Sequence, residues 1–83
     1  PLPDDINVAL WEALRECRRE LAEEQSVPPY VIFHDSTLVE MCSVAPKTLD
    51  AFSKLSGVGE RKLMKYGEAF IAVIKNTEQE QLG

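Results

Sequence analysis

The sequence predicts a small all-α domain, a compact five-helix bundle. Apolar residues recur at helical spacing, prolines and glycines separate the helical segments, and the one short run of consecutive apolar residues has no partner strand. The 83 residues suffice for one domain with a modest core, and a hydrophobic fraction of 45% is that of a globular protein. We expect a leader at residues 1–7, a helical domain at residues 8–76 and a flexible polar tail at residues 77–83.

The first predicted helix spans Val8–Glu24, and either Asp5 or Asn7 can cap its start. Its apolar residues form one stripe at spacings of four, three and four, and Trp11 widens this stripe toward the core. The stripe consists of Leu10, Leu14, Cys17 and Leu21. The charged residues between them are expected to face solvent.

The double proline Pro28-Pro29 ends this helix, because proline cannot continue it and restricts the residue before it. Tyr30–Phe33 follows as four apolar or aromatic residues in a row. We expect a short extended connector that crosses the bundle, with Val31 and Phe33 in the core.

Four more helices are expected, each bounded by residues that cap or break helices. In chain order they are a helix that starts within His34–Thr37 and ends before Pro46, a short helix capped by Thr48, a helix over Gly59–Tyr66, and a helix over Glu68–Asn76 after a break at Gly67. The residues expected to be buried are Leu10, Leu14, Leu21, Phe33, Leu38, Leu55, Leu63 and Phe70.

The turn Gly57-Val58-Gly59 has the pattern of a helix-hairpin-helix. Gly57 can take the positive φ that closes a preceding helix, and Gly59 allows backbone or a ligand to approach closely. The helix that follows begins with free N–H groups, which can hold a phosphate. The same pattern also suits a turn that only joins two helices.

Charge is unevenly distributed along the chain. The formal net charge is −5, which argues against a general nucleic-acid binder. Residues 1–45 carry three basic and nine acidic side chains, a balance of −6, whereas residues 46–75 carry six basic and three acidic ones, a balance of +3. A DNA-binding role would therefore be local and weak, and would lie in the half that contains the glycine turn.

No catalytic site, metal site or other cofactor site is expected. His34, Asp35 and Ser36 are adjacent in sequence and suit a helix cap better than a catalytic relay. With a single histidine and two cysteines, Cys17 and Cys42, the chain offers no metal-ligand cluster. Both cysteines lie at apolar positions of helices, so we expect small buried thiols in a reducing cytosol. No stretch is apolar and long enough to span a membrane.

Four blocks of the chain resemble the HRDC domain, whose name means helicase and RNase D C-terminal. Their order and spacing fit the family over about residues 8–76. The blocks are Leu10-Trp-x-x-Leu14-Arg-x-x-Arg18 leading to Leu21-Ala, Val27-Pro-Pro-Tyr-Val-Ile-Phe33, Asp35-x-Thr-Leu38-x-Glu-Met41, and Leu55-Ser-Gly-Val-Gly-x-x-Lys62-x-x-x-Tyr-Gly67. The pattern is most similar to the HRDC domain of bacterial RecQ DNA helicases.

The resemblance implies a non-catalytic accessory domain of an ATP-dependent DNA helicase that acts in DNA repair and recombination. It implies weak binding to single-stranded or branched DNA, with the helicase core of the same chain as a second partner. It further implies a monomeric domain in the cytoplasm, associated with the nucleoid.

The resemblance also assigns DNA contact to the aromatic residue of the Pro-Pro-Tyr segment, which is Tyr30 here. A ring held at the surface can stack on an unpaired base; the alternative is a ring that lies flat on the first helix. The full set of candidate binding residues is Tyr30, Arg15, Arg18, Gly57, Gly59, Arg61, Lys62 and Lys65. Arg18 could instead brace the proline turn by donating to carbonyls, and the basic residues after the glycine turn could simply be solvated.

Two classes of function remain open from the sequence. The first is a nucleic-acid-binding accessory module of a RecQ-like helicase, favoured by Tyr30 and the basic half of the chain. The second is a protein-interaction or intramolecular docking module that uses the acidic first helix, favoured by the net charge of −5.

Overall fold

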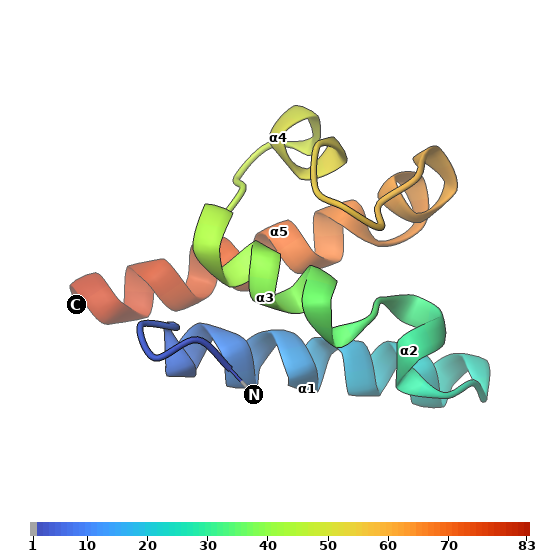
Figure 1. Ribbon diagram of the computed structural model, residues 1–83, viewed down its shortest axis with the longest axis horizontal. Helices are drawn as coiled ribbons and strands as arrows, with labels where there is room; N and C mark the ends of the chain where they lie inside the picture. The colour runs from blue at the N-terminus through green and yellow to red at the C-terminus, as the bar shows by residue number, and fades with distance from the viewer. Residues whose placement is uncertain (1) are drawn as a thin grey trace.

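The computed structural model describes residues 2–83 and contains five helices and no strand in that range. The helices are α1 (Val8–Gln25), α2 (Pro29–Ile32), α3 (Asp35–Val44), α4 (Leu49–Ser53) and α5 (Glu60–Leu82). The two long helices, α1 and α5, pack against each other; α2 and α3 pack on α1, and α4 packs on α5 (Figure 1). The predicted all-α fold with five helices is confirmed, although three segments differ from prediction: the connector after α1 is helical, the last two predicted helices are one, and the predicted tail belongs to that helix.

The segment after α1 is helical where an extended connector was predicted. Pro28 is the N-cap of α2 and Pro29 its first residue, a position at which the fixed φ of proline favours helix entry. The backbone N–H of Val31 donates to the carbonyl of Pro28 over 3.0 Å. In this helical register Ile32 is fully buried, whereas Val31, expected in the core, is 40% exposed. Within the predicted connector Tyr30–Phe33, only Phe33 is extended, with φ −152° and ψ 146°.

The two last predicted helices are a single helix, α5, and Gly67 does not break it. A Cβ atom on Gly67 would lie 2.9 Å from Cδ2 of Leu49 and 3.2 Å from Cδ1 of Leu63. The absence of a side chain at this buried position therefore lets α4 pack closely against α5. The glycine serves close packing between helices, which overrides its low helix propensity.

The C-terminal segment, predicted as a flexible polar tail, forms the last turns of α5 as far as Leu82. Thr77 is buried, and Glu78 forms an ion pair with Lys47 at 3.0 Å. The side-chain amides of Asn7 and Gln81 exchange two hydrogen bonds of 3.1 Å each. These contacts fix the end of α5 against the start of α1 and the α3–α4 connection.

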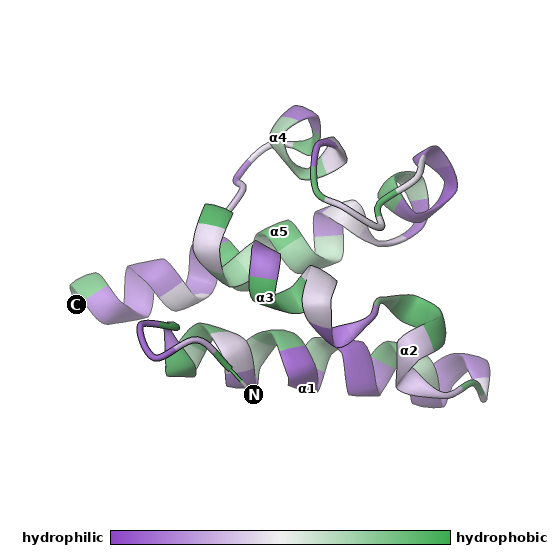
Figure 2. Cartoon of the chain, viewed as in Figure 1, coloured by the Kyte–Doolittle hydropathy of each residue, from purple (hydrophilic) through white to green (hydrophobic). Residues whose placement is uncertain are grey.

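Phe33 lies at the centre of the core. Its ring makes edge-to-face contacts with Phe52, Tyr66 and Phe70 at centroid distances of 6.1, 5.9 and 5.2 Å. All eight residues predicted to be buried are at least partly so: six are buried, and Leu21 and Leu63 pack partly buried against the core. Hydrophobic and hydrophilic bands alternate along α1 and α5, as expected for helices with one buried face (Figure 2).

Candidate nucleic-acid interface

Tyr30 is exposed on the second position of α2. The side chain is 59% exposed, and its ring lies nearly parallel to that of His34, with centroids 6.0 Å apart and an interplanar angle of 25°. The ring therefore stacks on His34 and remains largely exposed. Tyr30, His34 and Pro29 line a shallow hollow at the end of the domain that carries α2.

Arg18 reaches from α1 to the junction of α2 and α3, where it is buried. Its Nη1 donates a hydrogen bond to the carbonyl oxygen of Phe33 over 2.9 Å, and its Nη2 lies 2.8 Å from Oδ1 of Asp35. This geometry fits the bracing role considered from the sequence, because both ends of the guanidinium are engaged within the fold. Arg18 thereby fixes the backbone that carries Tyr30 on one side and His34 on the other.

Arg15 remains on the surface of α1, one turn before Arg18. Its guanidinium carbon lies 5.8 Å from the centroid of the buried Trp11 ring, and Nη1 is 3.9 Å from the Glu12 carboxylate. Arg15, Arg18 and Pro29 line a common hollow beside the one that Tyr30 lines. The structure therefore brings the two arginines of the first block next to the proline turn.

Gly57 has the positive φ predicted for it, at +81°. The turn is held on α3 by its neighbour Ser56, whose carbonyl accepts from the Thr37 hydroxyl at 3.1 Å and whose N–H donates to Glu40 at 3.0 Å. A Cβ on Gly57 would lie only 2.6 Å from Oγ1 of Thr37. Gly57 is thus required both by backbone conformation and by space.

Gly59 is the N-cap of α5, in ordinary extended geometry with φ −86°. No atom lies within 4 Å of the Cβ position that a side chain would occupy there, so the close approach predicted for Gly59 is not made within residues 2–83. No side chain in that range caps the helix start either. The first backbone N–H groups of α5 are therefore open to a partner outside the fold.

The basic residues that follow, Arg61, Lys62 and Lys65, differ in their surroundings. The Lys62 ammonium lies 5.7 Å from the centroid of Phe33 and the Lys65 ammonium 5.4 Å from that of Tyr66. Within residues 2–83, no carboxylate oxygen lies within 4.0 Å of any of the three basic groups. Their positive charge is thus not neutralised by a direct ion pair.

Phe33 connects the two sets of candidate residues. Arg18 binds its carbonyl from α1, and Lys62 lies over its ring from α5. Tyr30 lies on α2, just before Phe33, so the aromatic segment and the basic start of α5 occupy the same end of the domain, at the right of Figure 1. The sequence separates these residues by about 30 positions, and only the fold places them together.

Sequence reasoning missed His34, which was interpreted only as part of a helix cap. The structure makes it the N-cap residue of α3 but gives its side chain no capping hydrogen bond. Its ring is exposed and stacks on Tyr30. The sequence did contain a signal: the ring of His34 follows four residues after Tyr30, which was already a candidate for DNA contact.

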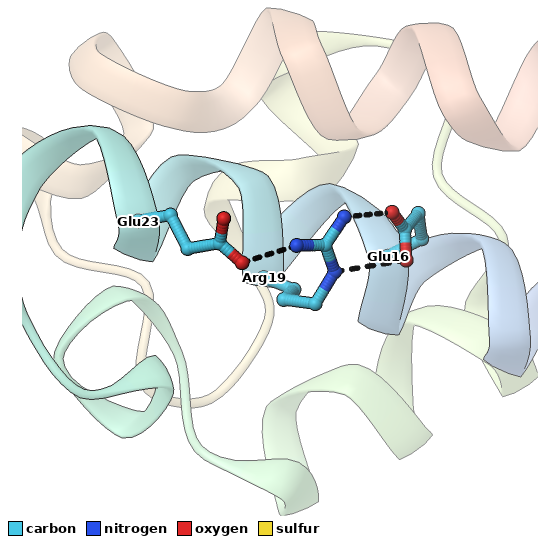
Figure 3. Close-up of polar contacts among 3 residues, drawn as sticks. All are labelled: Glu16, Arg19 and Glu23. Carbon is cyan, nitrogen blue, oxygen red and sulfur yellow. Dashed lines mark hydrogen bonds and ion pairs between the residues drawn. The ribbon is translucent and has the colours of Figure 1, made fainter.

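The outer face of α1 is acidic and partly internally paired. Arg19 lies between Glu16 and Glu23 and binds both carboxylates along the helix (Figure 3). The hydrogen bond from Arg19 lowers the pKa of Glu16, and the two carboxylates raise the pKa of Arg19. Five acidic and three basic side chains leave α1 with a balance of −2.

Comparison of the sequence and the fold with known proteins identifies the family of this chain. Residues 7–74 match the family model described as the HRDC domain. The chain is 46% identical over 69 residues to the ATP-dependent DNA helicase RecQ of Bacillus subtilis, covering 83% of this chain and 12% of the relative. It is 34% identical over 71 residues to the ATP-dependent DNA helicase UvrD2 of Mycobacterium bovis, covering 86% of this chain and 10% of that protein.

A solved structure described as "D. radiodurans RecQ HRDC domain 3" superimposes with a TM-score of 0.82 and 37% sequence identity. The match covers 84% of this chain and 92% of that one. The fold is thus that of a small accessory domain found in RecQ helicases, and this chain belongs to the HRDC domain family. The resemblance inferred from the four sequence blocks is confirmed.

The chain spans about an eighth, 12%, of the length of the RecQ relative. Within residues 2–83, no three His, Cys, Asp or Glu side chains gather into a group that could hold a metal ion. None of the described helices combines the length and apolar character needed to cross a membrane.

Proposed function

We propose that this domain is a nucleic-acid-binding accessory module of a RecQ-type DNA helicase, which binds single-stranded or branched DNA weakly and helps to direct the motor to it. The observation that carries the proposal is Tyr30, an aromatic ring 59% exposed on a fixed helical turn, at the same end of the domain as three basic groups without carboxylate partners. An exposed ring next to positive charge is the combination that binds unpaired strands.

The role of each residue follows from its surroundings. Tyr30 stacks on a base, while the exposed residues Arg61 and Lys65 contact phosphates together with the open N–H groups after Gly59. Lys62 adds positive charge beside the aromatic segment. Arg18 acts indirectly, by holding the backbone on which Tyr30 lies, and Arg15 adds charge at the edge of the same hollow.

Affinity should be modest. One base–aromatic stack contributes roughly 1–3 kcal/mol, and the few phosphate contacts operate against a net charge of −5. A weak, monomeric auxiliary site suits a domain tethered to a motor, because the tether supplies a high effective concentration. In this role the domain has no ATPase activity of its own. It acts in the cytoplasm, in association with the nucleoid.

The test is a titration of the isolated domain with an oligothymidine, followed by NMR chemical shifts at low and high salt. Tyr30→Ala should weaken binding about fivefold or more, the lower end of what a lost base stack predicts. The control is Val31→Ala, because Val31 is its exposed neighbour and carries no ring. Equal binding by wild type and Tyr30→Ala would overturn the proposal.

A second candidate function rests on the acidic face of α1. Glu20 and Glu24 are exposed and form no ion pair within residues 2–83, so this face could dock on a basic surface such as the helicase core of the same chain. Charge reversal there, Glu20→Lys with Glu24→Lys, should then abolish association with a helicase core and leave oligothymidine binding intact. In the DNA-binding function the same variant should bind DNA somewhat more tightly.

A further inference from the structure

Tyr30 and His34 together form a broader aromatic surface than either ring does alone. Both side chains are exposed, their planes differ by only 25°, and their centroids are 6.0 Å apart. This distance falls in the range of offset-stacked rings, in which each ring covers only part of the other. A large part of both rings is therefore available to a ligand at the same time.

The backbone beneath the two rings is held at several points. The ring of Phe33, between them, is buried in the core, and its carbonyl is bound by Arg18. The carbonyl of His34 accepts hydrogen bonds from the N–H groups of Thr37 and Leu38, at 3.1 and 3.3 Å. A ligand that stacks on this pair therefore has little backbone to order, which favours binding by a preformed surface.

Local stability does not explain a histidine at position 34. The N-cap of a helix favours Ser, Thr, Asn or Asp, whose side chains accept a hydrogen bond from the first turn. His34 occupies the N-cap of α3 without making that bond. Its side chain instead contacts Tyr30, the residue on which the proposed function depends.

We propose that Tyr30 and His34 act as one two-ring stacking surface for two successive unpaired bases, and that His34 is a DNA-contacting residue. The inference rests on the proposed function and specifies its substrate. Bases stacked in a duplex are separated by about 3.4 Å, well below the 6.0 Å between the ring centroids. Successive bases must therefore be spread apart to lie on both rings, which an unpaired strand permits and a duplex does not.

The test uses three variants of the isolated domain, Tyr30→Ala, His34→Asn and His34→Phe. Asparagine removes the ring but is among the best N-cap residues, so His34→Asn should melt no lower than wild type. Phenylalanine keeps a ring without the imidazole nitrogens. Each variant is titrated with a fluorescent oligothymidine of about 10 nucleotides, a length within the site sizes of single-strand binding modules.

We expect His34→Asn to weaken binding about fivefold, at the low end of the range for a lost base–aromatic stack, and His34→Phe to bind within about twofold of wild type. Because the chain has one histidine, the ring protons of His34 give single NMR signals, which should shift on addition of the oligonucleotide.

The outcomes separate the two proposals. If Tyr30→Ala weakens binding and His34→Asn does not, the two-ring surface is wrong and the proposed function stands. If neither variant changes binding, or the wild-type domain does not bind, both proposals are overturned. If His34→Phe binds as weakly as His34→Asn, the imidazole nitrogens and not the stacking ring hold the DNA, and the stacking proposal fails.

Discussion

Arg18 on α1 donates a hydrogen bond from Nη1 to the main-chain carbonyl of Phe33, 2.9 Å away. This contact joins the buried side of α1 to the junction between α2 and α3. Because Nη2 of the same side chain binds Asp35 at 2.8 Å, one planar group bridges two points of the junction. Arginine suits this position because its donors are arranged in a rigid fork.

Arg18→Lys should therefore destabilise the domain despite keeping the charge. A lysine ammonium cannot present the same fork, and a buried carbonyl that loses its donor costs about 1–3 kcal/mol. Thermal unfolding followed by circular dichroism measures the effect. The control is Arg19→Lys, whose exposed ion pairs should contribute little; equal melting temperatures for the two variants would contradict the bracing role.

Gly57→Ala should destabilise by more than about 1 kcal/mol, because alanine at positive φ is strained and its Cβ would meet the Thr37 hydroxyl 2.6 Å away. Gly59→Ala is the matched control two residues later, since its φ of −86° is ordinary and its Cβ position is open. Urea denaturation measures both. If the two alanine variants unfold at the same midpoint, the geometry assigned to Gly57 is wrong.

Removing the charges of Arg61 and Lys65 should flatten the salt dependence of DNA binding. For single strands each phosphate contact contributes about 0.7 to the slope of log K against log salt, so the double variant Arg61→Gln, Lys65→Gln should lose about 1.4. Lys75→Gln serves as a control on the same helix, away from the proposed surface. An unchanged slope in the double variant would exclude phosphate contacts at the start of α5.

The two cysteine thiols should react slowly in the folded domain. Burial raises the pKa of Cys17 and of Cys42 to about 11, with a further contribution from Glu20 at Cys17. Relative to the ordinary value of 9.0, two pKa units mean about a hundredfold less thiolate at pH 8. Alkylation by iodoacetamide should accordingly be much slower in buffer than in urea, and equal rates would contradict the burial.

The same pKa shifts predict a loss of stability at high pH. A thiol whose pKa is higher in the folded state contributes to the stability of the fold. This contribution is fully present below pH 9 and is lost as the pH rises to about 11. Because lysine and tyrosine also titrate there, the comparison is with the variant Cys17→Ala, Cys42→Ala. Between pH 8 and 11, the wild type should lose more unfolding free energy than this variant does.

Deleting residues 77–83 should destabilise the domain by about 1–2 kcal/mol, because it removes the buried Thr77, the Lys47–Glu78 ion pair and the amide pair of Gln81 with Asn7. Gln79→Ala, at an exposed position of the same turns, should be nearly neutral. Thermal unfolding of the two proteins provides the comparison. A truncated domain as stable as the full chain would show that these helical turns contribute nothing.

The sequence predicted what depends on local chemistry. The Thr48 cap of α4 and the positive φ of Gly57 follow from residue type, and the structure confirms both. The stripe of α1 is confirmed in part: Leu10 and Leu14 are buried and Cys17 and Leu21 partly so, whereas Arg18, expected to face solvent with the other charged residues, is buried. The errors arose where one residue type permits two outcomes. Pro29 was interpreted only as the end of α1, although proline is also favoured at the first position of a helix.

Tertiary contacts decided the remaining errors. Gly67 has a poor helix propensity, but the side chains of Leu49 and Leu63 occupy the space beside it, and no pattern within α5 reveals this. The polar end of α5 is likewise held by residues far away in sequence, such as Lys47 and Asn7. The candidate interface was predicted residue by residue, whereas the meeting of Arg18 and Lys62 around Phe33 depends on how α1 and α5 pack.

The amide pair between Asn7 and Gln81 joins positions 74 residues apart and brings the two ends of the helical bundle together. Figure 1 shows the end of α5 opposite the end with α2 along the longest dimension of 34 Å, whereas the segment before α1 turns back beside α1, where Leu2 and Pro3 line a hollow with Trp11. In a longer polypeptide, a segment that follows α5 would therefore leave the domain at the end opposite α2. The domain would then be attached to the following segment at one end of its longest dimension. The length of that linker would set how far the domain can move, and the surface around Tyr30 would lie at the opposite end of the domain from the attachment after α5.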